Sequence, residues 1–425
     1  MFLGLDFGTS GARACVINHA KTIVWEQRVA YANPAEQTPL DWRGALHSLL
    51  SALPENIAAQ LRGLAIDGTS ATVLLCDAQL DPLHPCLLYH DSRAQQQAEQ
   101  LKVFAPGGNI VCTATSGLAK FLSLTQQIAL PQNIEKAAYF LHQADWLTAL
   151  LSGQPGISDY HNALKTGYDV EQLCWPDWIM ALPHAHLLPQ VLAPGDVIGI
   201  IQPDIAKHFG IHPHCAIHAG TTDSNAAFIA SDINEVGVGV TSLGSTLVLK
   251  QLSTQRIAAP EYGVYSHRYG DLWLVGGASN AGGAVLRQYF NDEQLVALSE
   301  QVDPLQDSPL DYYPLSKPGE RFPINDAQFA PRPLRFSAGQ TTPRPVNDVE
   351  FLHGLLQGLA RIEVAAYAKL AELGAPPLKR VITTGGGAKN IVWQKMRARL
   401  LAVPISAAVN SEAAYGSALL CLIPT

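Results

Sequence analysis

Apolar runs at residues 2–5 and 12–17 predict two buried strands near the start of the chain. The stretch between them is short and contains Gly8 and Gly11, which permit the positive φ angles of a tight hairpin. A similar strand, glycine–hydroxyl turn and strand follows about 230 residues later, over residues 238–249. The pattern therefore predicts the same kind of hairpin once in each half of the chain.

Strand and helix patterns alternate through the rest of both halves. Thr38, Pro39 and Asp41 suit the N-cap, N1 and N3 positions of an amphipathic helix. Asn347 suits the N-cap of a long helix that ends before Gly374. Further strands are predicted at residues 22–31, 64–67, 73–76, 87–89, 216–219, 380–383 and near 405, and further helices at residues 390–401 and 412–422.

Mixed strands with helices between them, present twice, predict an α/β fold of two domains. We place the boundary after Asp223, which gives domains of residues 1–223 and 224–425 with a central cleft between them. We leave open whether the helix at residues 412–422 packs back onto the first domain.

Composition restricts the class of protein. The chain has 425 residues, of which 15% are charged and 48% hydrophobic, values typical of a compact globular protein. A net charge of −8 does not indicate the basic surface that nucleic-acid binding requires. The seven cysteines are scattered and form no C-x-x-C pair, and no apolar run approaches the ~20 residues of a membrane span. We predict a cytoplasmic protein with no nucleic-acid or membrane partner, and we leave a homodimer open.

The first hairpin offers groups that suit phosphate and metal binding. Thr9 and Ser10 supply hydroxyl donors for phosphate oxygens, and Asp6 lies at a strand end, where a hydrated Mg²⁺ can be held. An ordinary hairpin with turn-type residues is the alternative. The chain has no G-x-x-x-x-G-K-[ST] motif and no G-x-G-x-x-G after a strand, so P-loop and Rossmann nucleotide sites are excluded.

Asp223 is the candidate general base. It follows a predicted strand and has Gly220, Thr222 and Ser224 around it, so its carboxylate is expected to face the cleft. From the residues alone the alternative is a helix N-cap, because an apolar helical pattern begins directly after it.

Four motifs occur in order: residues 3–14, 219–227, 238–249 and 383–390. This ordered set resembles the FGGY carbohydrate kinases, members of the actin-like ATPase superfamily, over nearly the whole chain. The resemblance implies two actin-like (ribonuclease H-like) domains around a central cleft, ATP and Mg²⁺ as cofactors, and a small-molecule sugar substrate.

The resemblance also assigns site residues. It implies Asp223 as the catalytic base and Asp6 as the metal site. The sugar would be bound by residues of the first domain: Asp6, Ser70, Asp91 and Asp223. The nucleotide would be bound by Gly8, Thr9, Ser10, Ser242, Gly244, Ser245, Thr246, Gly386, Gly387, Asn390 and Trp393. For Trp393 the alternative is a place in the core.

The substrate is argued from the segment Asp-Gly-Thr-Ser that ends at Ser70. In xylulose kinases the segment at this position resembles Gly-Gln-x-His, and this chain has no such His. The segment is more similar to the short D-ribulose kinases of the same family, which implies ATP-dependent phosphorylation of D-ribulose to D-ribulose 5-phosphate. The alternatives are D-xylulose, L-ribulose or glycerol as substrate, or a non-catalytic nucleotide-binding regulator or chaperone-like ATPase.

His212, His214 and His218 lie close together in the sequence, as zinc ligands often do. A Pro between them favours a turn that leads into a strand. Whether this cluster has a role is left open.

Overall fold

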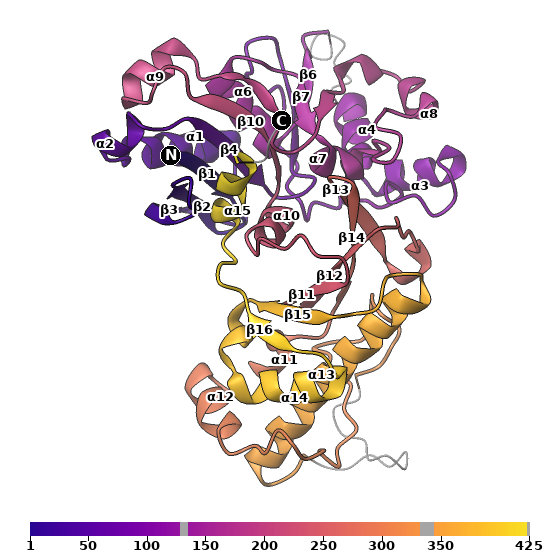
Figure 1. Cartoon of the computed structure of the whole chain (residues 1–425). Helices are drawn as coiled ribbons and strands as arrows, with labels where there is room; N and C mark the ends of the chain where they lie inside the picture. The colour runs from indigo at the N-terminus through magenta and orange to yellow at the C-terminus, as the bar shows by residue number, and fades with distance from the viewer. Residues whose placement is uncertain (128–134, 332–343, 423–425) are drawn as a thin grey trace. The chain divides into compact units, whose positions relative to one another are not determined.

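The computed structural model describes residues 1–127, 135–331 and 344–422. It divides into two compact units (Figure 1): the first comprises Met1–Asp232 and Asn410–Thr425, and the second Ile233–Val409. The predicted boundary at Asp223 falls at the first residue of a helix that belongs to the first unit. The relative position of the two units is not determined, so the predicted cleft between them stays a prediction.

A six-stranded mixed sheet forms the centre of the first unit, in the order β3-β2-β1-β4-β10-β9. The first three strands are antiparallel, whereas β4 runs parallel to β1 and β10 parallel to β4. The strands of this sheet are β1 (Phe2–Phe7), β2 (Gly11–Ile17), β3 (Ile23–Ala30), β4 (Gly63–Gly68), β9 (Val197–Ile200) and β10 (Ala216–Thr222).

Two small sheets and a set of helices complete the first unit. The small sheets pair β5 (Val73–Cys76) with β6 (Tyr139–His142), and β7 (Ile157–Asp159) with β8 (Gln190–Leu192). The helices are α1 (Pro39–Ser51), α2 (Glu55–Ala58), α3 (Gln95–Phe104), α4 (Gly117–Gln127), α6 (Gln143–Ser152), α7 (Tyr160–Ala163), α8 (Asp177–Met180), α9 (Pro203–Phe209), α10 (Asp223–Ile229) and α15 (Ala413–Leu420).

Five strands of the second unit repeat the order β3-β2-β1-β4-β10 of the first, as β14-β12-β11-β15-β16. The sheet of the second unit has the order β13-β14-β12-β11-β15-β16, with β11, β12 and β14 antiparallel, β15 parallel to β11 and β16 parallel to β15. The strands are β11 (Val238–Leu243), β12 (Leu247–Ser253), β13 (Tyr265–Tyr269), β14 (Leu272–Ser279), β15 (Arg380–Thr384) and β16 (Ile405–Ala407). The helices are α11 (Gly283–Leu286), α12 (Asp292–Ser299), α13 (Asp348–Glu372) and α14 (Ile391–Leu401).

Local sequence signals explain several of these elements. The capping box predicted at Thr38 and Asp41 is present at the start of α1, and the Asn347 side chain caps α13. The strand predicted at residues 87–89 is wrong, because Leu87 forms only an isolated bridge with Val73. No helix among the described residues is long and apolar enough to cross a membrane.

Helix α15 packs on β1, β4 and α10 within the first unit (Figure 1). Two glycines allow the close approach. A Cβ at Gly4 would lie 1.9 Å from the Ala414 carbonyl oxygen, and a Cβ at Gly416 would lie 1.9 Å from the Ala226 carbonyl oxygen. The packing of the last helix against the first unit, left open by the sequence, is therefore the arrangement that the structure has.

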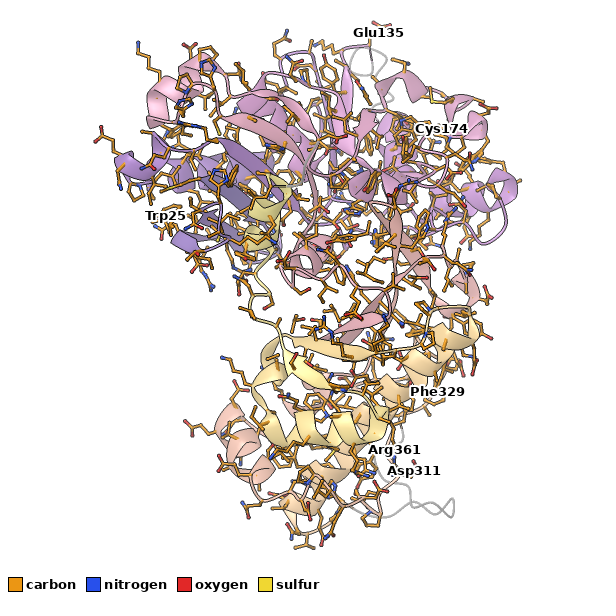
Figure 2. All side chains as sticks on the ribbon, in the orientation of Figure 1. Trp25, Glu135, Cys174, Asp311, Phe329 and Arg361 are labelled. Atoms are coloured by element: carbon orange, nitrogen blue, oxygen red, sulfur yellow. The ribbon has the colours of Figure 1, made fainter. Side chains whose placement is uncertain are left out.

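The core of the second unit is built on α13. Gly354 and Gly358 let the segment around Tyr312 pack closely on this helix. At the rim, Arg361 and Asp311 form an exposed ion pair of 3.6 Å (Figure 2). The helix also contacts β12 and β14 of the sheet that carries the second hairpin.

Candidate active site

Two buried carboxyl groups meet at the ends of neighbouring parallel strands. Asp6 on β1 is in register with Asp67 on β4, and their side chains are 2% and 0% exposed. Asp6 Oδ2 accepts a hydrogen bond of 3.1 Å from Arg13, and Asp67 Oδ2 accepts one of 2.6 Å from the Ser417 hydroxyl on α15. The Oδ1 atom of each has no donor among the described residues.

The pKa values of this pair are raised. Burial raises the pKa of Asp6, and burial together with the charge of Asp6 raises that of Asp67, to which Asp223 adds a further increase. The two carboxyl groups are neighbours on adjacent strands, and the charge of Asp6 acts on Asp67. Such a pair needs a shared proton or a cation between its oxygens.

Asp67 is a candidate site residue that the sequence did not single out. The available signal was an acid that ends an otherwise apolar run, residues 64–66, directly before the Gly-Thr-Ser turn. A single acid in a strand end is weak evidence without its partners, and Asp6 and Ser417 are far away in the sequence.

Asp223 is half-buried at the first residue of α10, directly after β10. The N-cap of α10 is Thr222, so the alternative of Asp223 as the N-cap is not what the structure has. β10 shifts register between His218 and Thr221, and a Cβ at Gly220 would lie 1.9 Å from the Ile66 carbonyl oxygen. The glycine therefore permits the bulge that precedes Asp223.

The first hairpin leaves its hydroxyls open beside Asp6. Thr9 and Ser10 are exposed, while the Gly8 N–H donates to the Gly11 carbonyl across the turn. A Cβ at Gly8 would lie 3.4 Å from Asp6 Oδ1. A side chain at position 8 would thus contact the unpartnered oxygen of Asp6.

The predicted sugar residues Ser70 and Asp91 lie on two turns of the first unit. Ser70 is half-buried in the turn closed by the Thr72 N–H donating to the Thr69 carbonyl. Asp91 accepts hydrogen bonds from the Arg93 guanidinium. Burial works to raise the pKa of Asp91, but these hydrogen bonds outweigh it and hold the pKa below its usual value.

In the second unit the structure brings two predicted nucleotide segments together. β11 and β15 are parallel neighbours, with Ser242 in register with Thr384, so the second hairpin and the glycine triplet follow at the same sheet edge. A Cβ at Gly387 would lie 2.7 Å from the Leu243 Cβ. At the hairpin tip Ser245 is exposed, while Ser242, Gly244, Thr246 and Gly387 are half-buried and Gly386 is exposed with open space beside it.

A buried ion pair supports this edge from below. Arg397 on α14 donates to Glu363 on α13 at 2.7 Å, and both side chains are almost completely buried. Glu363 also accepts from the Thr241 hydroxyl at 2.6 Å, and Arg397 donates to the Thr383 hydroxyl at 2.9 Å. The two threonines come directly before the hairpin and the glycine turn on their strands.

Two predicted nucleotide residues have other roles in the structure. Trp393 is 3% exposed and donates its ring N–H to the Leu356 carbonyl at 3.1 Å, so the core alternative holds for its ring. Asn390 caps α14 through the Trp393 N–H and donates to the Ser299 hydroxyl. A stacking role of Trp393 on a base therefore stays a prediction, to which its buried ring lends no support.

The histidine cluster is not a metal site. His218 is buried and its Nδ1 lies 2.7 Å from the Gly195 carbonyl oxygen, whereas His214 is exposed. Across the described ranges, no group of three or more His, Cys, Asp or Glu side chains could hold a metal ion.

Comparisons with known proteins agree with this geometry. The model for the N-terminal domain of the FGGY family of carbohydrate kinases matches residues 1–230, and that for the C-terminal domain matches residues 239–424. A xylulose kinase of Escherichia coli K12 is 25% identical over 419 residues, covering 94% of this chain and 84% of the relative. A gluconokinase of Bacillus subtilis is 22% identical over 428 residues, covering 93% and 81%.

The fold comparison is consistent with the sequence comparison. The crystal structure of a xyloylose kinase from Brucella ovis matches with a TM-score of 0.85 at 24% identity, covering 99% of this chain and 90% of that one. This likeness and the duplicated sheets confirm the predicted two-domain actin-like α/β fold. Because the two family models together span nearly the whole chain, the chain belongs to the FGGY family of carbohydrate kinases.

Proposed function

We propose that this kinase transfers the terminal phosphoryl group of ATP to a hydroxyl of a ketose, with Asp223 as the general base. The observation that carries the proposal is the position of three acids, Asp6, Asp67 and Asp223, at the ends of β1, β4 and β10 or directly after them. These strands are adjacent and parallel, so their carboxyl ends share one sheet edge.

In this reaction the sugar hydroxyl loses its proton to Asp223 while its oxygen forms a bond to the phosphorus of ATP, and the bond to ADP breaks. Thr9 and Ser10 supply donors for phosphate oxygens in the first unit. Ser242, Ser245 and the backbone of the glycine turn supply them in the second. The protein's work is mainly to orient the reactants and to offset phosphate charge.

Asp6 and Asp67 fit a divalent cation. Each has a buried oxygen without a donor, and Mg²⁺ in kinases is held by one or two carboxylates together with water and phosphates. When bound, Mg²⁺ would supply positive charge against the transferred phosphoryl group. In its absence the pair needs a proton, which is consistent with the raised pKa values.

D-Ribulose is the proposed substrate, because the segment Asp-Gly-Thr-Ser ends in the short side chain of Ser70. In xylulose kinases the segment at this position resembles Gly-Gln-x-His instead. D-Xylulose is the second candidate, favoured by relatives that are named xylulose kinases. The two sugars differ in configuration at one carbon, and a site that hydrogen-bonds one hydroxyl rejects its misplacement strongly.

The test is ADP release with purified protein, ATP, Mg²⁺ and a panel of D-ribulose, D-xylulose, L-ribulose, gluconate and glycerol. We expect sugar-stimulated turnover with the highest kcat/KM for D-ribulose. A higher value for D-xylulose or gluconate would reject the substrate and keep the kinase. ADP release that no sugar stimulates would instead favour a regulator or a chaperone-like ATPase.

A further inference from the structure

Lys120 is a fully buried lysine that none of the steps above uses. It lies on α4, its side chain is 0% exposed, and Phe121 and Leu118 beside it belong to the apolar core. Burial lowers the pKa of the Lys120 ammonium to about 7, even though the charge of Asp91 opposes this shift. An apolar side chain of the same length would avoid that cost, so the ammonium itself needs an explanation.

All three donors of the ammonium go to backbone carbonyls. Nζ lies 2.7 Å from the Ala71 oxygen, 2.7 Å from the Leu88 oxygen and 3.3 Å from the Tyr89 oxygen. A lysine ammonium has three N–H groups, so these bonds use its full capacity. The two parts of the chain that it joins are otherwise connected here by the backbone pair between Val73 and Leu87.

These carbonyls belong to the two turns that carry the proposed sugar residues. Ala71 directly follows Ser70 and has a left-handed φ of 61°, which a residue with a side chain adopts only when its surroundings require it. The Leu88 carbonyl also accepts from the Asp91 N–H at 2.9 Å, so it closes the turn that ends in Asp91. One ammonium therefore holds the Ser70 turn and the Asp91 turn together.

We propose that Lys120 is a positioning residue for the sugar site: it sets the spacing of Ser70 and Asp91 and so determines sugar affinity and epimer selectivity. This inference rests on the proposed sugar-kinase function and on the two proposed sugar residues. Loss of a purely structural lysine would lower the stability of the protein and affect sugar and ATP binding alike. Loss of a positioning lysine would weaken sugar binding and leave ATP binding unchanged.

The test uses the full chain with Lys120→Met, which keeps the length and removes the donors. We expect the KM for the preferred sugar to rise about tenfold or more and the ratio of kcat/KM for D-ribulose and D-xylulose to approach one. The KM for ATP should change less than twofold. Lys120→Arg retains donors and should restore part of the sugar affinity.

Hydrogen exchange gives a readout that needs no activity. Amides of residues 69–73 and 87–91 should exchange faster in Lys120→Met than in the wild type, while those of β1 and β2 stay unchanged. Lys102→Met is the matched control, because Lys102 on α3 is 52% exposed and pairs with Glu99, which is also exposed. It should leave both the kinetics and the exchange unchanged.

The outcomes separate this inference from the proposed function. If wild-type protein phosphorylates no sugar, the proposed function fails, and exchange alone decides whether Lys120 holds the two turns. If the wild type is active but Lys120→Met keeps its sugar KM, its epimer ratio and its exchange pattern, the positioning role is overturned. Should Lys120→Met not fold, Lys120→Gln, which retains two N–H donors, replaces it in the same measurements.

Discussion

Asp223, the proposed general base, is the first residue of α10. Its carboxylate accepts a hydrogen bond from the Ser224 N–H, while Thr222 occupies the N-cap position. We expect Asp223→Asn to lower kcat by about 10² to 10⁴, the usual range for a lost general base, and to leave the affinity for sugar and ATP nearly unchanged. Steady-state kinetics and substrate titrations measure the two effects.

The matched control is Asp204→Asn, at an exposed acid in the first turn of α9. It should retain wild-type turnover. Near-normal kcat in Asp223→Asn would remove Asp223 from the mechanism.

Asp67 leads to a prediction about pH. Burial and the charge of Asp6 raise its pKa in the folded state above the unfolded value near 3.9. Its contribution to stability is therefore fully present below that value and is lost as the pH rises through the folded pKa. Asn has no charge and still accepts the Ser417 hydrogen bond, so Asp67→Asn should gain stability relative to the wild type as the pH rises.

Urea denaturation midpoints at pH 5 and pH 8 measure this difference. The variant minus wild-type midpoint should be larger at pH 8. A difference that stays constant or shrinks with rising pH would mean that Asp67 is ionised in the folded state without cost.

At this scale the sequence proposes Asp6 and Asp223 as site residues, but not Asp67 or Lys120. Asp6 and Asp223 stand in motifs with glycines and hydroxyls as neighbours, so local pattern was sufficient to propose them. Asp67 is a candidate because it lies beside Asp6 and accepts from Ser417, and Lys120 because it donates to carbonyls about 30 and 50 residues away in the sequence. These contacts form only when the chain folds, so the local sequence does not indicate them. For Trp393 the sequence left a nucleotide contact and a place in the core open, and the structure buries its ring in the core.

Among the elements, α13 and α14 are joined by the buried pair of Arg397 and Glu363. Arg397→Met would leave Glu363 buried without its cation, and we expect a loss of about 3–5 kcal/mol in the free energy of unfolding. Because the pair also holds Thr241 and Thr383, the same variant should weaken ATP binding. Chemical denaturation and nucleotide titration measure the two effects.

Arg361→Met on the same helix is the control, because its ion pair with Asp311 is exposed (Figure 2). It should cost less than about 1 kcal/mol. Equal losses for the two arginines would contradict the idea that the buried network supports the hairpin.

Helix α15 depends on glycine contacts. Gly416→Ala would place a methyl group against the Ala226 carbonyl of α10, and we expect destabilisation of about 1–3 kcal/mol or more, because the neighbour is backbone. Gly44→Ala on α1 has open space around it and should stabilise by about 0.5–1 kcal/mol. Thermal unfolding of the two variants would show shifts of opposite sign, and equal signs would argue against tight packing of α15.

Element positions were predicted well where caps and strand ends are local. The Thr38 and Asn347 caps and the strand at residues 73–76 follow from neighbouring residues. The strand expected at residues 87–89 failed because Leu87 forms only an isolated bridge and the Leu88 carbonyl accepts from Lys120 and from the Asp91 N–H of a turn. Of its apolar residues, Leu87 lies in the core around α4, whereas Tyr89 is exposed.

At the scale of the molecule, the two units differ in continuity. The second is one uninterrupted stretch with its own core, whereas the first needs residues 410–420 in addition to residues 1–232. We expect a fragment of residues 233–409 to unfold cooperatively by itself, and a fragment of residues 1–232 to lack a cooperative transition. Circular dichroism during heating distinguishes these cases.

A synthetic peptide of residues 410–422 provides the control for the second fragment. Added in excess to residues 1–232, it should restore a cooperative transition in proportion to its concentration. A fragment of residues 1–232 that unfolds cooperatively without the peptide would show that α15 is dispensable for the first unit.

The place of α15 also fixes an order of events during synthesis. The ribosome releases residues 1–232 first, but the helix that covers β1 and donates to Asp67 follows only after the whole second unit. For that period the face of the sheet under α15 is exposed and the Asp67 carboxyl group lacks its Ser417 donor. The first unit to be translated is thus the last to be completed, and a nascent chain cannot present a finished catalytic sheet before the second unit has emerged.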